Sequence, residues 1–322
     1  MKTSAGILTL CLSSVAMAAT AYAADLPRWA YPLNPPVVPG TQPPKDDGTP
    51  KHVPGSNIAL TRTQIAGRDG VPDWHPDDHP TMPDVVNKGR MPEVRACGYC
   101  HTPSGAGRPE NASLAGLTPA YIKQQVMNFR NSDRKGSEPK RVPQNLMMGI
   151  AQHVTDAEVE QAAAYFSSIK PVSSVKIVEA GTVPKTTVVG GMMAKAPEGG
   201  MEPIAGRIIE VPDDTERAEL RDDKTTFTAF VPLDALKKGE ALVATGGNGK
   251  TLQCGICHGA DLKGLGDVPR IAGRSPSFLM RQLYDIQNGT RSGSAVLMKQ
   301  VVAKLDNDDM VAIAAYVASR VP

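Results

Sequence analysis

A five-residue motif occurs twice in this 322-residue chain, as CGYCH at 97–101 and as CGICH at 254–258. Two cysteines three positions apart, followed directly by histidine, form the attachment signature of a c-type haem. On a helical turn, residues i and i+3 share a face, so both thiols can reach the two vinyl groups along one porphyrin edge and form thioethers. The next residue, His101 or His258, then lies under the iron as proximal ligand. We therefore predict two covalently bound haems c, attached through Cys97, Cys100, Cys254 and Cys257.

Other uses of these cysteines fit the pattern less well. Zinc ligand pairs carry no requirement for histidine at the next position. A redox dithiol is expected near a βαβ pattern, which is not evident here. The fifth cysteine, Cys11, lies in a segment that we expect to be removed. No cysteine then remains for a disulfide between the motifs.

The N-terminus predicts export. Lys2, an apolar run from 7 to 15 and Ala21-Tyr22-Ala23 form a signal peptide over 1–23 with cleavage before Ala24. No later stretch approaches the roughly 18 to 20 apolar residues of a membrane span. We therefore expect a soluble protein without an integral membrane segment, in an oxidising compartment such as the bacterial periplasm.

Self-comparison shows that each motif begins one copy of a repeated unit. Residues 97–136 align with 254–293, and 147–169 align with 298–320, both without a gap. A period this long indicates a duplicated domain, because solenoid repeats are shorter. Identical pairs beyond the motif include Gly107 with Gly264, Gln125 with Gln282, Asn131 with Asn288, Arg134 with Arg291, Gly136 with Gly293 and Tyr165 with Tyr316.

Each copy reads as helical. Thr118-Pro119 and Ser275-Pro276 combine an N-cap residue with a first-turn proline, and apolar residues recur at helical spacing after them. Thr155 opens a capping box with Glu158, and Asp306 opens the equivalent C-terminal helix. We predict a short haem-bearing helix, a loop, a middle helix, a methionine-bearing loop and a C-terminal helix in each copy.

Two methionines are candidates for the sixth iron ligand. Met147 and Met298 occupy matched positions, each eighteen residues before the matched tyrosine. A thioether is a soft ligand suited to haem iron, and Met/His ligation raises the reduction potential. The alternative is that a methionine merely fills a gap in the core. Recurrence in both copies favours Met147 and Met298 as ligands, although the adjacent Met148 is an alternative to Met147.

With these motifs, the chain resembles a diheme member of the class I cytochrome c family. The resemblance covers roughly 85–171 and 239–322. It implies mainly α structure, with two class I cytochrome c domains in tandem, covalent haem c, His/Met ligation of both irons and one-electron transfer. The iron ligands would be His101 with Met147 and His258 with Met298.

Two stretches lie outside this pattern. Residues 24–84 form a proline-rich arm, with thirteen prolines between 24 and 83, and are expected to be extended rather than an ordinary core. The inter-domain insert 172–238 has β-branched runs separated by glycine pairs, which predict short strands or irregular hairpins. The predicted haem domains are then 85–171 and 239–322. The arm and the insert are either spacers or surfaces for partners.

The four remaining histidines, at 52, 75, 79 and 153, are expected on the surface. His75 and His79 lie in WHPDDHP, which could hold a metal but is more typical of a turn. Lys plus Arg total 35 against 33 for Asp plus Glu, and aromatic residues make up only 4%. This balance does not favour nucleic acid as a partner.

The sequence favours an electron carrier over an enzyme. With histidine and methionine on each iron, no position remains open for a substrate. Partners would be periplasmic redox proteins, such as a dehydrogenase donor and a cytochrome or oxidase acceptor. Two alternatives stay open: a cytochrome subunit of a periplasmic dehydrogenase complex, and a diheme enzyme such as a peroxidase or sulfur-compound oxidase, which would need a displaceable ligand.

Overall fold

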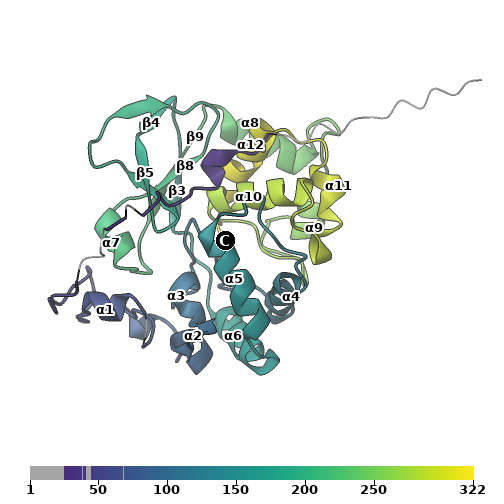
Figure 1. Ribbon diagram of the computed structural model, residues 1–322. Coiled ribbons are helices and arrows are strands. Elements are labelled where there is room, and N and C mark those ends of the chain that lie inside the picture. The colour runs from purple at the N-terminus through teal and green to yellow at the C-terminus, as the bar shows by residue number, and fades with distance from the viewer. Residues whose placement is uncertain (1–24, 38, 41–44, 68) are drawn as a thin grey trace, which may run out of the picture.

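The computed structural model describes residues 25–37, 39–40, 45–67 and 69–322, so the predicted signal peptide and Cys11 lie outside the described residues. Two helical domains pack against each other, and a strand-rich segment lies beside both of them (Figure 1). Among the described residues, none of the helices combines the length and apolar character that crossing a bilayer requires. The mainly α architecture with a partly β insert is as predicted.

The first haem domain begins after the arm. It contains α2 (Asp84–Asn87), β1 (Gly89–Arg90), β2 (Val94–Arg95), α3 (Cys97–His101), α4 (Pro119–Arg130), α5 (Val142–His153) and α6 (Asp156–Ser168). The predicted helix starts are confirmed, because Thr118 caps α4 and Thr155 forms the capping box with Glu158 at α6. The expected methionine-bearing loop is wrong, because Met147 lies inside α5.

The second haem domain repeats this order. It contains α8 (Ala235–Thr245), α9 (Gly255–His258), α10 (Pro276–Gln287), the 3-10 turn η3 (Gly293–Ala295), α11 (Met298–Val302) and α12 (Asn307–Ala318). Ser275 caps α10, and Asp306 forms a capping box with Asp309 at α12. Helix α8 lies so close to α12 that a Cβ on Gly239 would approach the Ala312 carbonyl oxygen to 2.1 Å. Only glycine allows this contact.

The insert forms short strands, as predicted, together with one short helix. Its elements are β3 (Val175–Glu179), β4 (Thr182–Pro184), β5 (Thr186–Val189), β6 (Met192–Lys195), β7 (Met201–Pro203), β8 (Ile209–Pro212), α7 (Thr215–Glu219) and β9 (Phe227–Val231). The central strand β9 runs parallel to β3 and antiparallel to β8. Ala229 and Val231 of β9 belong to the hydrophobic core of the second haem domain. The insert is therefore anchored on that domain.

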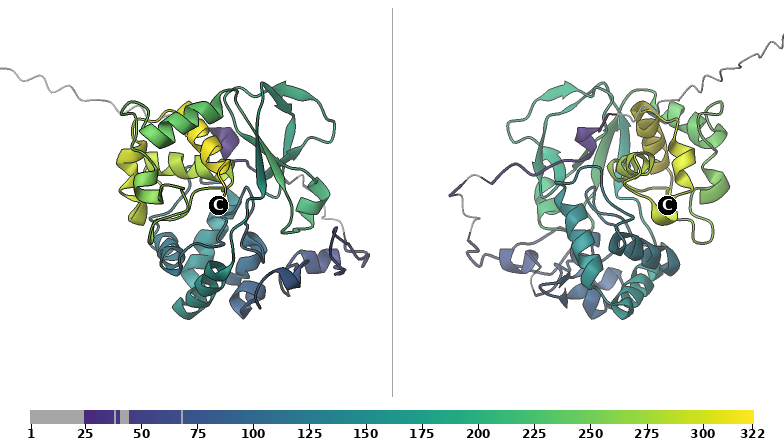
Figure 2. Two further views of the ribbon diagram at one scale, coloured as in Figure 1. Left: turned by 180° about the vertical axis from the view of Figure 1, so that it is seen from behind. Right: turned by 45° about the vertical axis from the view of Figure 1, so that its right-hand side comes forward.

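The arm is more ordered than its composition suggests. It contains η1 (Arg28–Ala30), α1 (Arg62–Ile65) and η2 (Pro76–Asp78). The expectation that it builds no core is wrong for its second half, where Val53, Ile65 and Trp74 are buried together. The right view of Figure 2 shows the described parts of the arm on the outside, near the second haem domain and the insert at one end and near the first haem domain at the other. The arm therefore contacts both haem domains and the insert.

Matched residues of the two copies meet where the haem domains touch. The Arg134 guanidinium donates to Gln125 Oε1 at 2.8 Å and to Gln282 Oε1 at 3.1 Å. The Arg291 guanidinium donates to the same oxygens at 3.2 and 3.0 Å. Arg134 and Arg291 also form an antiparallel bridge between their backbones. Each copy thus contributes the same arginine and glutamine to a nearly symmetric interface.

Candidate functional site

Both motif histidines have one ring nitrogen held by the backbone. The Nδ1 of His101 lies 2.7 Å from the Ala112 carbonyl oxygen, and the Nδ1 of His258 lies 2.8 Å from that of Pro269. Ala112 and Pro269 occupy matched positions in the two copies. Because a carbonyl only accepts, Nδ1 carries the proton and Nε2 keeps its lone pair free for a metal. Burial lowers the pKa of both rings, which favours the neutral form that binds iron.

The motif cysteines are not activated thiols. Burial raises the pKa of Cys97 to about 12 and that of Cys254 to about 11, and it also raises the pKa of Cys100. A redox or nucleophilic cysteine needs the opposite shift, which stabilises the thiolate. The four motif cysteines are unpaired, and no disulfide is formed among the described residues. These environments suit thioether attachment rather than redox chemistry at sulfur.

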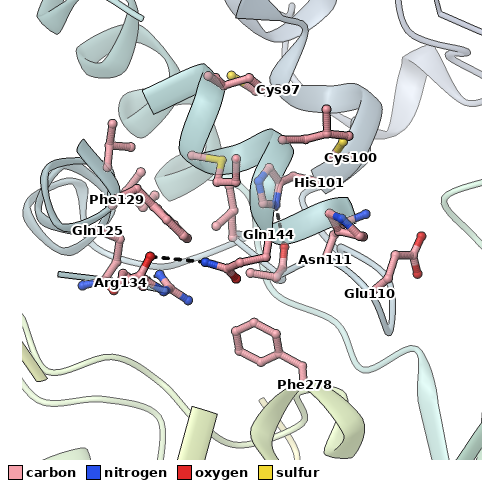
Figure 3. Close-up of a pocket in the computed structure, with 18 of the residues that line it drawn as sticks. Cys97, Cys100, His101, Glu110, Asn111, Gln125, Phe129, Arg134, Gln144 and Phe278 are labelled. Carbon is pink, nitrogen blue, oxygen red and sulfur yellow. Dashed lines mark hydrogen bonds between the residues drawn. The ribbon is translucent and has the colours of Figure 1, made fainter. Parts of the chain in front are cut away.

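The first motif lines a cavity of about 150 Å³ between the two domains (Figure 3). Cys97, Cys100 and His101 lie at one side of it, and Phe278 of α10 approaches from the other domain. Most of the wall is apolar and comes from α4, α5 and α6. Its apolar members include Leu114, Leu117, Ile122, Val126, Phe129, Ile150, Val159 and Phe166.

Four buried arginines also line this cavity without a carboxylate partner. They are Arg134, Arg141, Arg274 and Arg281, and the last two come from the second haem domain. Their hydrogen bonds go to neutral oxygens, such as Ser113 O for Arg274 and Ala30 O for Arg281. Burial lowers the pKa of Arg134 and Arg141 to about 9. An unpaired buried cation is costly, so the cavity is built for an anionic occupant.

The chemistry of this cavity fits a haem. The apolar wall matches the porphyrin face, the two thiols and the free Nε2 match its vinyl groups and iron, and the arginines match its two carboxylates.

The second motif has a more open setting. Cys257 is exposed, Ile256 of the motif is 63% exposed, and the nearby Leu252 and Leu265 are 58% and 61% exposed. His258 itself is buried. Exposed apolar residues around a buried histidine suit a cofactor whose thioether edge faces outward.

Comparison with known proteins agrees with this geometry. The family model for cytochrome c matches residues 91–170. Cytochrome c-554(548) of Halomonas halodenitrificans is 34% identical over 79 residues, which cover 24% of this chain and 95% of the relative. This chain belongs to the cytochrome c family. The cofactor is accordingly covalently bound haem c, and the fold is that of a diheme cytochrome.

Longer matches span both haem domains. Cytochrome c4 of Azotobacter vinelandii is 24% identical over 70% of this chain and 84% of its own length. The solved structure of thiosulfate dehydrogenase (TsdBA) from Marichromatium purpuratum has a TM-score of 0.50 and 26% identity. That match covers 74% of this cytochrome and 39% of the solved chain, so this cytochrome spans well under half of that protein.

The structure favours Met147 over Met148 as the sixth ligand of the first haem. Met147 lines the cavity with His101, whereas Met148 does not. Neighbouring helix residues point about 100° apart, so both cannot face one iron. In the second domain, Met298 begins α11, not a loop as expected, and packs with Cys254 against the core. Ligation by Met147 and Met298 remains a prediction that this placement supports.

Two of the histidines expected on the surface are not exposed. His75 is 6% exposed and its Nε2 lies 3.0 Å from Asp222 Oδ1 in the insert. The side chain of His79 is 3% exposed and its Nε2 lies 3.1 Å from Asp73 Oδ1. The turn predicted for WHPDDHP is confirmed as η2. Sequence reasoning missed the burial because the partner of His75 is 147 residues away.

His75, Asp222 and Asp223 also bring three possible metal-ligand atoms within 4.8 Å of one another. Both oxygens of Asp222 already accept hydrogen bonds, from Arg217 and from the Lys224 amide. Through these contacts, the three residues connect the arm to the insert.

The cavity arginines from the second domain were also missed. Arg274 and Arg281 match Leu117 and Gln124 in the first copy. The available signal was a charge in one copy at a position that is apolar or neutral in the other. A duplicated domain acquires such differences where its two copies face different surroundings.

Proposed function

We propose that this cytochrome is an exported electron carrier, which exchanges single electrons with redox proteins in the periplasm and does not turn over a substrate. The observation that carries the proposal is the matched ligand set. Each copy presents a histidine with a free Nε2 and a methionine at an equivalent position. Iron held on both sides by protein ligands has no position for a substrate, and Met/His ligation is typical of electron-transfer cytochromes.

The chain's own residues supply the rest of this function. The backbone carbonyls of Ala112 and Pro269 fix both histidine rings, and the apolar wall of the first site keeps water from one haem. The exposed apolar residues around the second motif bring another haem within reach of a partner. Electrons would therefore enter and leave through the second site.

Stopped-flow mixing of the purified holoprotein with redox partners tests this proposal. We expect rapid one-electron reoxidation of both haems by a soluble cytochrome acceptor. Assays for peroxidase, thiosulfate-oxidising and sulfite-oxidising activity should show no turnover. Turnover in any of them by the unmodified holoprotein would replace the carrier with an enzyme.

A second candidate is a cytochrome subunit of a dehydrogenase complex. The observation that favours it is the similarity to part of a thiosulfate dehydrogenase chain. The arm and the insert would then carry contacts to the dehydrogenase. Size-exclusion chromatography of the native periplasmic extract separates the two functions, because a free carrier elutes at the mass of this chain alone and a subunit elutes with a dehydrogenase in fixed ratio.

A further inference from the structure

The second haem domain contributes positively charged side chains to the wall of the first cavity, whereas the matched residues of the first haem domain are uncharged. Arg274 and Arg281 of the second copy line the first cavity. The matched residues of the first copy, Leu117 and Gln124, carry no charge. Arg141 lies in the stretch that has no counterpart in the second copy. The matched positions of the two copies therefore share their predicted iron ligands but differ in positive charge.

Nearby carboxylates do not cancel this charge. Glu110 and Asp285 are the acidic residues of the cavity wall. Glu110 pairs with Arg108 at 2.7 Å, and Asp285 accepts hydrogen bonds from Tyr31 at 2.7 Å and from Ser137. The four buried arginines therefore have no carboxylate partner, and a haem brings two propionates. The buried Nε atoms of Arg141 and Arg274 also have no hydrogen-bond partner.

We propose that Arg134, Arg141, Arg274 and Arg281 hold the propionates of the first haem and give it the higher reduction potential of the two. This inference rests on the proposed function, since it assumes that both haems exchange electrons. Reduction adds one electron, supplied by a redox-protein donor, and neither forms nor breaks a bond. Buried positive charge stabilises the added electron, because it acts in a low-dielectric site with little screening. At equilibrium a single electron then rests on the first haem, and the second exchanges it with partners.

Exchange of the arginines for their first-copy counterparts tests the inference directly. The variant is Arg274→Leu with Arg281→Gln, and the measurement is a spectroscopic redox titration of the holoprotein. A Met298→His background identifies the second haem, whose potential falls when its methionine is replaced. We expect the equilibrium between the haems to shift at least tenfold toward the second haem, which is 59 mV for one electron.

Arg130→Gln serves as the control for charge. Arg130 is the last residue of α4 in the first domain, but it pairs with Asp156 and does not line the cavity. Its loss should shift the equilibrium between the haems less than threefold. If the double variant fails to fold, the single variants Arg281→Lys and Arg281→Gln are compared instead. Arg281→Lys keeps the charge but not the paired donors, so it should shift the equilibrium between the haems less than Arg281→Gln does.

Three results would overturn the proposal: a first haem of lower potential in the unmodified protein, equal shifts for both haems, or no shift in a variant with both haems bound. Failure of the carrier function looks different, because it appears as substrate turnover or as slow reoxidation with both potentials unchanged.

Discussion

The two haem motifs carry the same predicted iron ligands in different surroundings. In the first motif, Tyr99 lies between the guanidinium groups of Arg95 and Arg221, at 3.7 and 3.8 Å from the ring centre. The matched residue of the second motif, Ile256, is 63% exposed. Arg108 donates to Ala218 O of the insert, whereas its counterpart Leu265 is 61% exposed.

The difference comes from what was added around the first copy. Arg221 and Ala218 belong to the insert, Tyr31 to the arm, and Arg274 and Arg281 to the other haem domain. A small haem domain has little core of its own. The insert, the arm and the other haem domain therefore all contribute contacts to the first motif and its cavity. Duplication supplied the second electron site, and the additions made the two sites unequal.

Loss of haem attachment should separate the two sites most strongly. Cys97→Ser with Cys100→Ser leaves the inter-domain cavity empty, which costs on the order of 4 kcal/mol for about 150 Å³ at ~24 cal/mol per Å³. The matched control, Cys254→Ser with Cys257→Ser, removes a haem from the open site and should cost less than half as much. Mass spectrometry counts the remaining haem, and urea unfolding measures stability. Equal losses of stability would show that the first site is no better enclosed.

The methionine variants come next in effect. Met147→Leu should remove about half of the weak sulfur-to-iron band at the red end of the visible spectrum, because leucine offers no ligand atom. Met298→Leu should remove the other half. The neighbouring Met148→Leu is the control and should leave the band unchanged. Loss of the band in Met148→Leu instead would exchange the roles of these two residues.

Local signals in the sequence predicted most of the haem domains. Thr118, Thr155, Ser275 and Asp306 cap helices where expected, since capping depends only on residues three positions apart. The methionine loops were wrong because proline near the start of α5 and apolar residues at helical spacing favour a helix through Met147. The site histidines and cysteines follow from one motif.

The rest of the first site depends on distant contacts. His75 meets Asp222, Trp74 donates to Leu220 O at 2.8 Å, and Arg281 donates to Ala30 O. No periodicity or cap encodes these pairs, because each joins segments more than a hundred residues apart. A proline-rich composition similarly suggested an extended arm, while a few apolar residues such as Trp74 were enough to bury part of it.

Charge placed on the open site should slow exchange with partners. Leu265→Glu puts a carboxylate among the exposed apolar residues around the second motif, and we expect about a tenfold lower rate of reduction by a redox partner, as for other desolvated interface positions. Leu233→Glu is the control, since Leu233 is 65% exposed and lies in the insert. Stopped-flow absorbance at low and moderate salt measures both. An equal effect of the two variants would mean that partners do not approach through the second site.

The glycine at the second position of each motif provides a smaller, matched test of packing. A Cβ on Gly98 would lie 3.0 Å from the Val86 carbonyl oxygen, whereas on Gly255 its nearest neighbour would be Ala260 Cα at 3.4 Å. Gly98→Ala should therefore destabilise the first domain by about 1 kcal/mol, through overpacking against α2. Gly255→Ala should be neutral or slightly stabilising, because alanine is the better helix former. Urea unfolding of both holoproteins measures the change in stability. A larger loss of stability for Gly255→Ala than for Gly98→Ala would contradict the tighter packing of the first motif.

The smallest expected effect is a dependence of arm docking on pH, confined to the first site. The hydrogen bond to Asp73 raises the pKa of His79. A group whose pKa is higher in the folded protein stabilises it fully below the unfolded value of about 6.5, and this contribution is lost as pH rises through the folded pKa. Tyr165 of α6 also contacts His79, at 3.1 Å, so the pair ties the arm to the first haem domain. We expect His79→Gln to lower the free energy of unfolding more at about pH 5.5 than at about pH 9. The difference between the two losses should be less than 1 kcal/mol. The matched tyrosine, Tyr316, packs against Arg320 instead, so Tyr316→Phe should show no such difference. A His79→Gln effect that grows with pH would mean that the neutral ring holds the arm, and the enclosure of the first haem would then not weaken in base.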